Sequence, residues 1–232
     1  MCTASVRPSE QGWSLMELLI SGLLASLLLL AAAQLLTALM QSYARQTAWL
    51  DMEQRAQLLM LALEQDWTRQ EQLVAVGGAS APYPRPQQHR QTIDHEPRLS
   101  FMQQQDSDWL LWRDAQQQLS LWHLDHKTYD TGLAHNRTNT AGQWIGSQTL
   151  IPDVELWRVR LWSEAAGWQR PDQLTEQEQI LGVHYAFILV SAQPLPSVRP
   201  SSWSLWGETW HAPDDGRLRQ LYQGVYYHAL AR

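Results

Sequence analysis

The feature that most constrains this chain is a single carboxylate inside a long apolar segment near its amino terminus. Residues 13–40 are mostly apolar, and Glu17 is the only one of them that carries a formal charge. Moving a carboxylate to bilayer depth costs about 2.5 to 3.5 kcal/mol on insertion scales. The segment is otherwise long enough to cross a membrane. A chain with this pattern therefore needs another group that compensates Glu17.

The residues around Glu17 resemble the amino terminus of a type IV prepilin. A short polar leader ends in Gly12, the aromatic Trp13 follows, and Glu17 lies four residues further on. The resemblance implies that a membrane prepilin peptidase cuts between Gly12 and Trp13 and methylates the new amine of Trp13. It also implies that Glu17 meets the amine of a neighbouring subunit during assembly. An ammonium and a carboxylate buried together offset each other's desolvation, whereas either alone is penalised.

An ordinary signal anchor that happens to contain a glutamate is the alternative interpretation of this segment. An ordinary secretory signal is cleaved after its apolar stretch, close to small residues, and the alanines at 31–33 would serve. The two interpretations therefore predict different mature amino termini. The prepilin resemblance implies that residues 1–12 stay in the cytoplasm, that one segment crosses the bacterial inner membrane, and that the rest of the chain lies in the periplasm until it joins a pilus or pseudopilus tip.

Composition limits the partners and the covalent chemistry of the chain. Its 232 residues suit one membrane segment and one globular domain of ordinary size. The net charge is −6 and no basic run is present, so we expect no nucleic acid partner. The one cysteine, Cys2, lies in the expected leader. The mature protein would therefore contain no disulfide.

The pattern beyond the membrane segment predicts that the helix continues. No proline or glycine interrupts residues 23–76. Asp51 and Arg55 sit four apart as a helix-stabilising pair. Apolar side chains recur at steps of three and four and would share one helix face: Trp49, Met52, Ala56, Leu59, Leu63 and Trp67. We therefore expect one helix with a membrane and filament-core part, residues 13–40, and an amphipathic continuation, residues 41–76.

The rest of the chain predicts an antiparallel β-sheet domain on which the helix packs, an α+β fold. Residues 77–97 are rich in glycine and proline and predict a connector. Residues 98–232 alternate tryptophan-rich and branched segments with turn signals, which is typical of strands. The expected strands are 98–102, 109–113, 119–124, 154–162, 180–190, 202–210 and 218–230. We expect the first three to form a meander, the strand at 180–190 to be covered on both faces, and the last two to be joined by a turn at 214–216.

Tryptophan is unusually frequent, with thirteen copies against two phenylalanines. Packing in the core and on the sheets is the expected role of most of them, because tryptophan buries a large area. Trp203, Trp206 and Trp210 follow a proline-rich stretch. These three are the candidates for exposed contacts, either at a subunit interface or with glycans.

The sequence contains no pattern that predicts a metal site or catalysis. His123, Asp125 and His126 are close together, but two histidines three apart are adjacent only on a helix, and this segment alternates like a strand. We therefore expect an ordinary surface pair. Asp125 and Asp130 do not match a calcium loop, and no nucleophile elbow, phosphate-binding glycine loop or zinc-binding helix motif occurs. We expect no metal, no cofactor and no enzymatic activity.

Three further segments resemble minor pilins of the PilW/PulJ type. They are residues 58–69, residues 150–162, where Leu-Ile-Pro-Asp-Val enters an alternating strand, and Arg217-Leu218-Arg219 before the last apolar strand. The resemblance implies a minor pilin in a tip complex that primes pilus assembly, with other minor pilins and the major pilin as partners. A pseudopilin at the tip of a type II secretion system and a pilus-tip adhesin with exposed tryptophans are the alternatives.

Overall fold

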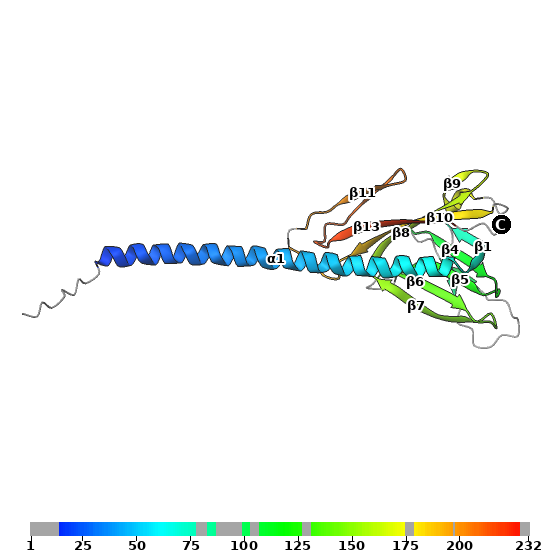
Figure 1. Ribbon diagram of the computed structural model, residues 1–232, viewed down its shortest axis with the longest axis horizontal. Helices are drawn as coiled ribbons and strands as arrows, with labels where there is room; N and C mark the ends of the chain where they lie inside the picture. Colours follow the sequence, from blue (N-terminus) through cyan, green and yellow to red (C-terminus); the bar gives the residue numbers. More distant parts are fainter. Residues whose placement is uncertain are drawn as a thin grey trace, which may run out of the picture. The chain divides into compact units, whose positions relative to one another are not determined.

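The protein consists of one long helix followed by antiparallel strands (Figure 1). The computed structural model describes residues 14–77, 83–86, 99–102, 107–126, 131–174, 179–196 and 198–227. The chain divides into two compact units, residues 1–46 and 47–232.

Helix α1 spans Leu15–Trp67 and contributes to both units. In the second unit its buried face contains Met52, Ala56, Leu59, Leu63 and Trp67, which confirms most of the predicted stripe. Trp49 is the exception, because 44 % of it is exposed. The predicted pair of Asp51 and Arg55 forms at 2.5 Å. This part of α1 is therefore amphipathic, as its sequence predicts.

The helix ends earlier than predicted. It stops at Trp67, and strand β1, Gln70–Gly77, occupies the place of its expected last turns. The Thr68 hydroxyl donates a hydrogen bond to the Gln65 carbonyl at the point where the chain leaves the helix. β1 pairs antiparallel with β4, Trp109–Asp114. Tertiary pairing thus overrides helix propensity in a segment whose valines also suit a strand.

Five strands form the first sheet, in the order β1-β4-β5-β6-β7. β5 is Leu119–His126, β6 is Thr131–Thr138 and β7 is Trp144–Pro152. The predicted strands at 109–113 and 119–124 are confirmed as β4 and β5, which pair with each other. β6 and β7 were not predicted. β6 contains glycine, alanine and asparagine, which are weak strand formers, so its sequence lacks a strand signal.

Four strands form the second sheet, in the order β13-β10-β8-β9. The bounds are Val154–Ser163 for β8, Gly167–Gln169 for β9, Ile180–Val190 for β10 and Arg219–Tyr227 for β13. A short 3-10 helix, Pro171–Gln173, follows β9. The strong predicted strands at 154–162 and 180–190 are confirmed.

Two hairpins complete the β-rich unit and correct the predicted connections. β2, Tyr83–Pro86, lies in the expected connector and pairs with β3, Leu99–Met102, so β3 is not the first strand of a meander with β4. The other residues between 77 and 98 lie outside the described residues. The strand predicted at 202–210 is two strands, Ser202–Leu205 (β11) and Glu208–His211 (β12).

The turn between β11 and β12 explains why one predicted strand becomes a hairpin. Trp206 and Gly207 both have positive φ, 51° and 90°, which is the backbone of the two-residue turns that suit hairpins. Because β12 pairs with β11, it does not pair with β13 across the turn at 214–216, as predicted. β13 pairs with β10 instead.

One apolar core lies between α1 and the two sheets. β10 contributes Val183, Tyr185, Phe187 and Leu189 to this core. On the opposite face of β10, Ala186 and Ile188 pack against Leu205 of the β11–β12 hairpin. Both faces of β10 are therefore covered, as predicted, and the protein is an α+β chain with its helix packed on antiparallel sheets.

Candidate functional site

The first unit presents an apolar helix surface. Every residue of α1 from Leu15 to Met40 is exposed, and most are leucine or alanine. By length and composition this is a helix that could cross a membrane. The finding is compatible with membrane anchoring, which the sequence predicts.

Glu17 lies in the first turn of this helix and takes part in its amino-terminal cap. Its Oε2 accepts a hydrogen bond from the backbone N–H of Ser14 at 3.0 Å, and its own N–H donates to the Ser14 hydroxyl at 3.2 Å. This reciprocal pair is a capping box. A carboxylate in a first turn also interacts favourably with the helix dipole. Gly12 and Trp13, the predicted processing residues, lie outside the described residues.

A buried acid, Asp66, joins the end of α1 to the first sheet. Its Oδ2 accepts hydrogen bonds of 2.7 Å from the Ser120 hydroxyl and from the Trp122 indole nitrogen. Arg137 donates to Oδ1, and His135 Nε2 lies 3.4 Å from Oδ2. The Asp66 side chain is only 3 % exposed. Four side chains from β5 and β6 therefore converge on one helix carboxylate, and we call this group the Asp66 cluster.

The Asp66 cluster favours the ionised acid. Burial by itself would raise the pKa of Asp66, but contact with His135 and hydrogen bonds from Trp122 and Ser120 outweigh it. The pKa is held well below its usual range as a result. Removing one partner from a buried charge pair costs about 3 to 5 kcal/mol, because the remaining charge loses its compensation. The cluster therefore fixes the carboxy-terminal end of α1 to the sheet.

Asp66, Ser120 and His135 are the residue types of a hydrolytic triad, so their geometry matters. In a triad, serine and aspartate contact opposite nitrogens of the histidine ring. Here Ser120 Oγ and Asp66 Oδ2 both lie at His135 Nε2, at 2.7 and 3.4 Å. Ser120 is also buried, and the His135 ring stacks on Trp122. This arrangement suits the fixation of the helix end better than the activation of a nucleophile.

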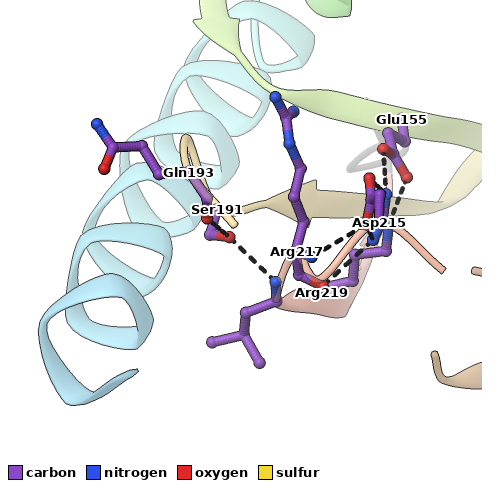
Figure 2. A network of polar contacts seen from close by, with 7 residues as sticks. Glu155, Ser191, Gln193, Asp215, Arg217 and Arg219 are labelled. Atoms are coloured by element: carbon purple, nitrogen blue, oxygen red, sulfur yellow. Dashed lines mark hydrogen bonds and ion pairs between the residues drawn. The ribbon is translucent and has the colours of Figure 1, made fainter. Parts of the chain in front are cut away.

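A second charge cluster fixes the start of β13 (Figure 2). The Arg219 guanidinium donates to both oxygens of Glu155 at 2.7 Å and to both oxygens of Asp215 at 2.6 and 2.7 Å. The Arg219 side chain is 2 % exposed. The hydrogen bond from Arg219 lowers the pKa of Asp215, and the hydrogen bond to Asp215 raises the pKa of Arg219. Only a guanidinium has enough donors in the required geometry to serve both acids.

The segment at residues 150–162 also contacts the helix through an ion pair. Asp153 lies between β7 and β8 with a positive φ of 60°, a conformation that aspartate tolerates better than most residues. Arg55 of α1 donates to Asp153 at 3.0 Å. The predicted alternating strand is confirmed as β8, but strand β7 precedes it in place of the predicted turn, and Asp153 between the two strands is bound to the helix.

The three candidate contact tryptophans lie on the β11–β12 hairpin. Trp203 and Trp210 are cross-strand partners with ring centroids 5.3 Å apart, and Trp206 is in the turn. All three are half-buried rather than exposed. They pack against the outer core of Leu156, Ala186, Ile188 and Leu205. A large part of their surface is therefore used within the chain.

The sequence predicts His123 at the surface, but the structure buries it. It is buried on β5, and its Nε2 lies 2.7 Å from the amide nitrogen of Asn136 on β6. Within the described residues, no group of three or more His, Cys, Asp and Glu side chains is arranged to hold a metal ion. His123 is accounted for by this contact between neighbouring strands.

The chain matches no protein-family model, no curated protein and no solved structure. Several contacts of α1 and of the β-rich unit were not predicted, among them the capping box of Glu17 and the Asp66 cluster. The capping box has a sequence signal, serine three residues before glutamate ahead of an apolar run. The Asp66 cluster has none, because its members come from residues 66, 120–122 and 135–137.

Proposed function

We propose that this protein is a minor type IV pilin of the PilW/PulJ type, which joins other minor pilins in a tip complex that primes pilus assembly. The observation that carries the proposal is helix α1. From Leu15 to Met40 it is apolar with Glu17 as its one charged residue, and it continues without a break to Trp67. Its second part packs on antiparallel sheets. The resemblance to prepilins implies this combination of a membrane anchor and a domain helix in one element.

The charge on Glu17 supports an assembly role. The capping box gives the carboxylate a hydrogen bond from Ser14 but no countercharge. Residues 14–44 contain no lysine, arginine or histidine, so a cation for Glu17 has to come from outside this part of the helix. The new amine of Trp13 on a neighbouring subunit would supply it and would favour the assembled state over the monomer.

The proposal includes the compartment and the partners. Residues 1–12 face the cytoplasm and are removed by the prepilin peptidase. The apolar part of α1 spans the inner membrane, and the β-rich unit lies in the periplasm until the subunit joins other minor pilins and the major pilin. The subunit itself has no catalytic role and binds no cofactor. The contacts of the Asp66 cluster support this, since they serve to attach α1.

The amino terminus of the mature protein is the first test. The full chain is expressed in the strain that carries its gene, purified from membranes and sequenced from the amino terminus by mass spectrometry. A chain that begins with Trp13 supports processing after Gly12. A chain that begins after the alanines at 31–33 is a secreted protein and overturns the proposal.

The second test separates processing from assembly. A Glu17→Gln chain keeps the size of the side chain but loses its charge, so we expect normal cleavage at Gly12 and strongly reduced surface piliation. Ser14→Ala is the matched control, because it removes the hydroxyl of the capping box and keeps the carboxylate. Wild-type piliation with Glu17→Gln would contradict the role of Glu17. If deletion of the gene blocks protein secretion but leaves piliation normal, the subunit belongs to a type II secretion system instead.

A further inference from the structure

The outer face of the second sheet, opposite α1, carries side chains that the core does not use. On β10 this face includes Gly182 and His184, which alternate with the core residues of the strand. Gly182 pairs with Trp162 on β8 and with Tyr227 on β13, and Trp162 pairs in turn with Trp168 on β9. The register therefore brings aromatic residues from four strands to one end of this face.

These side chains form a continuous row of rings. The ring centroids of Trp162 and Tyr227 are 6.4 Å apart, those of Tyr227 and Trp168 are 6.0 Å apart, and those of Trp168 and His184 are 5.6 Å apart. The His184 ring then meets Trp206 of the hairpin turn at 4.7 Å. Tyr227 is 59 % exposed, and the other four are half-buried. We call these five residues the aromatic row.

Gly182 makes room for the row. A Cβ atom at this position would lie 3.1 Å from Cδ1 of Tyr227 and 3.4 Å from the Trp168 ring. The first distance is shorter than an ordinary contact, so a side chain here would press the tyrosine away. The missing side chain thus lets the Tyr227 and Trp168 rings meet over β10.

Arginines border the row at its hairpin end. The Arg160 guanidinium lies 5.1 Å from the Trp206 ring centroid and donates to the Trp206 carbonyl at 3.0 Å. Arg158 and Arg170 lie 3.9 and 2.7 Å from Glu208. Arg158 makes a further contact. The formal charges of the other three groups, Arg160, Arg170 and Glu208, sum to +1. Burial and the neighbouring Arg170 lower the pKa of Arg160, and Glu208 raises it. These three groups together are positive on a chain whose net charge is −6.

We propose that the aromatic row binds an acidic polysaccharide, a chain whose sugar units carry carboxylates. The apolar faces of sugar rings stack on aromatic rings, and guanidinium groups bind carboxylates through paired hydrogen bonds. The net positive charge beside the row attracts carboxylates, whereas a neutral sugar offers no charge for it to attract. A local excess of +1 is small for nucleic acid, which is bound through many phosphate contacts. The proposal does not rest on a pilus role.

The test measures binding of the full chain, in detergent micelles, to immobilised polymers by biolayer interferometry. Polygalacturonate is the probe, since each sugar unit carries one carboxylate. Dextran controls for neutral sugar, polyglutamate for carboxylates without sugar rings, and single-stranded poly-dT for nucleic acid. We expect binding to polygalacturonate that is at least about tenfold tighter than binding to the other three. Equal or tighter binding to any of the three, or no binding to polygalacturonate, overturns the proposal.

Variants locate the binding on the aromatic row. Trp168→Ala and Tyr227→Ala are each expected to weaken polygalacturonate binding about tenfold, the scale of one lost stacking contact. Arg170→Gln should weaken polygalacturonate binding and reduce its dependence on salt. The matched control is Trp49→Ala, which removes an exposed tryptophan of α1 and should leave binding unchanged.

Conservative variants separate lost stacking from lost folding. Trp168→Phe and Tyr227→Phe keep a ring at each position and should retain most of the binding. Near-ultraviolet circular dichroism shows whether each alanine variant keeps the native packing of its remaining tryptophans. Native circular dichroism together with unchanged polygalacturonate binding in both alanine variants would refute the assignment to this face. If both alanine variants lose their native circular dichroism, unchanged binding by Arg170→Gln refutes it instead.

Discussion

Replacing Asp66 with asparagine is the sharpest test of how α1 is attached to the β-rich unit. The substitution keeps the shape of the side chain and removes its charge. It also places an amide NH₂ group among donors, since Ser120, Trp122 and Arg137 all donate to Asp66. We therefore expect Asp66→Asn to fold but to be clearly less stable than the wild type.

The magnitude follows from the number of contacts. Hydrogen bonds to a charged group are roughly twice as strong as neutral ones, and a neutral bond contributes about 1 kcal/mol net. The bonds from Ser120 and Trp122 lose their charge assistance, and Arg137 loses its countercharge in a buried site, which together predict a loss of about 3 kcal/mol in the free energy of unfolding. For a domain of this size that loss lowers the melting temperature by about 6 to 12 °C.

The assay is unfolding of the full chain in mild detergent, followed by tryptophan fluorescence during heating and in urea. Asp51→Asn is the matched control on the same helix. Asp51 is 57 % exposed and pairs with Arg55, so its loss should cost no more than about 0.5 kcal/mol. Equal melting temperatures for the two variants would show that the Asp66 cluster does not attach the helix.

The same variant predicts a dependence on pH. The pKa of Asp66 is lowered in the folded protein, whereas an unfolded aspartate titrates at about 3.9. The stabilisation is therefore complete above about pH 5, and it is lost as the pH falls further, because the unfolded state takes up the proton first. The difference in stability between wild type and Asp66→Asn should therefore shrink as the pH falls from about 5 through the unfolded value of about 3.9.

Other substitutions test other parts of the fold. Arg219→Lys keeps the charge but loses the paired hydrogen bonds to Glu155 and Asp215, so the free energy of unfolding in urea should fall by about 2 kcal/mol. Arg217→Lys should leave it almost unchanged. Equal effects of the two variants would show that the paired hydrogen bonds of Arg219 are not the cause. Gly224→Ala would place a Cβ atom 2.2 Å from the Tyr185 hydroxyl oxygen and should cost about 1 to 3 kcal/mol in the same assay. Gly22→Ala has no atom within 4 Å of the new Cβ and should strengthen α1 by up to about 1 kcal/mol, so a destabilised Gly22→Ala would contradict the exposed helix surface.

The helix and the strongest strands could be predicted because their signals are local. The stripe from Met52 to Trp67 has helical spacing, and β10 was predicted with the same bounds that the structure has. Long periodic segments carry their own evidence, since each buried residue repeats the same spacing. The α+β class followed from these elements alone.

The errors occur where distant residues decide the local structure. Residues 70–76 contain no proline or glycine, yet they pair with β4 and become a strand. The segment at 202–210 was predicted as one strand, yet the positive φ angles of Trp206 and Gly207 turn it back on itself. The aromatic row was likewise hidden, because its residues come together only through the register of four strands and one hairpin.

The position of Asp66, next to the last residue of α1, has a mechanical consequence. Tension along this part of the helix would load the bonds from Ser120, Trp122 and Arg137 at the same time, in shear. Slippage by one helical turn, about 5.4 Å, would rupture all of them together. The contacts between the sheet and the helix should therefore persist up to a threshold force and then break together.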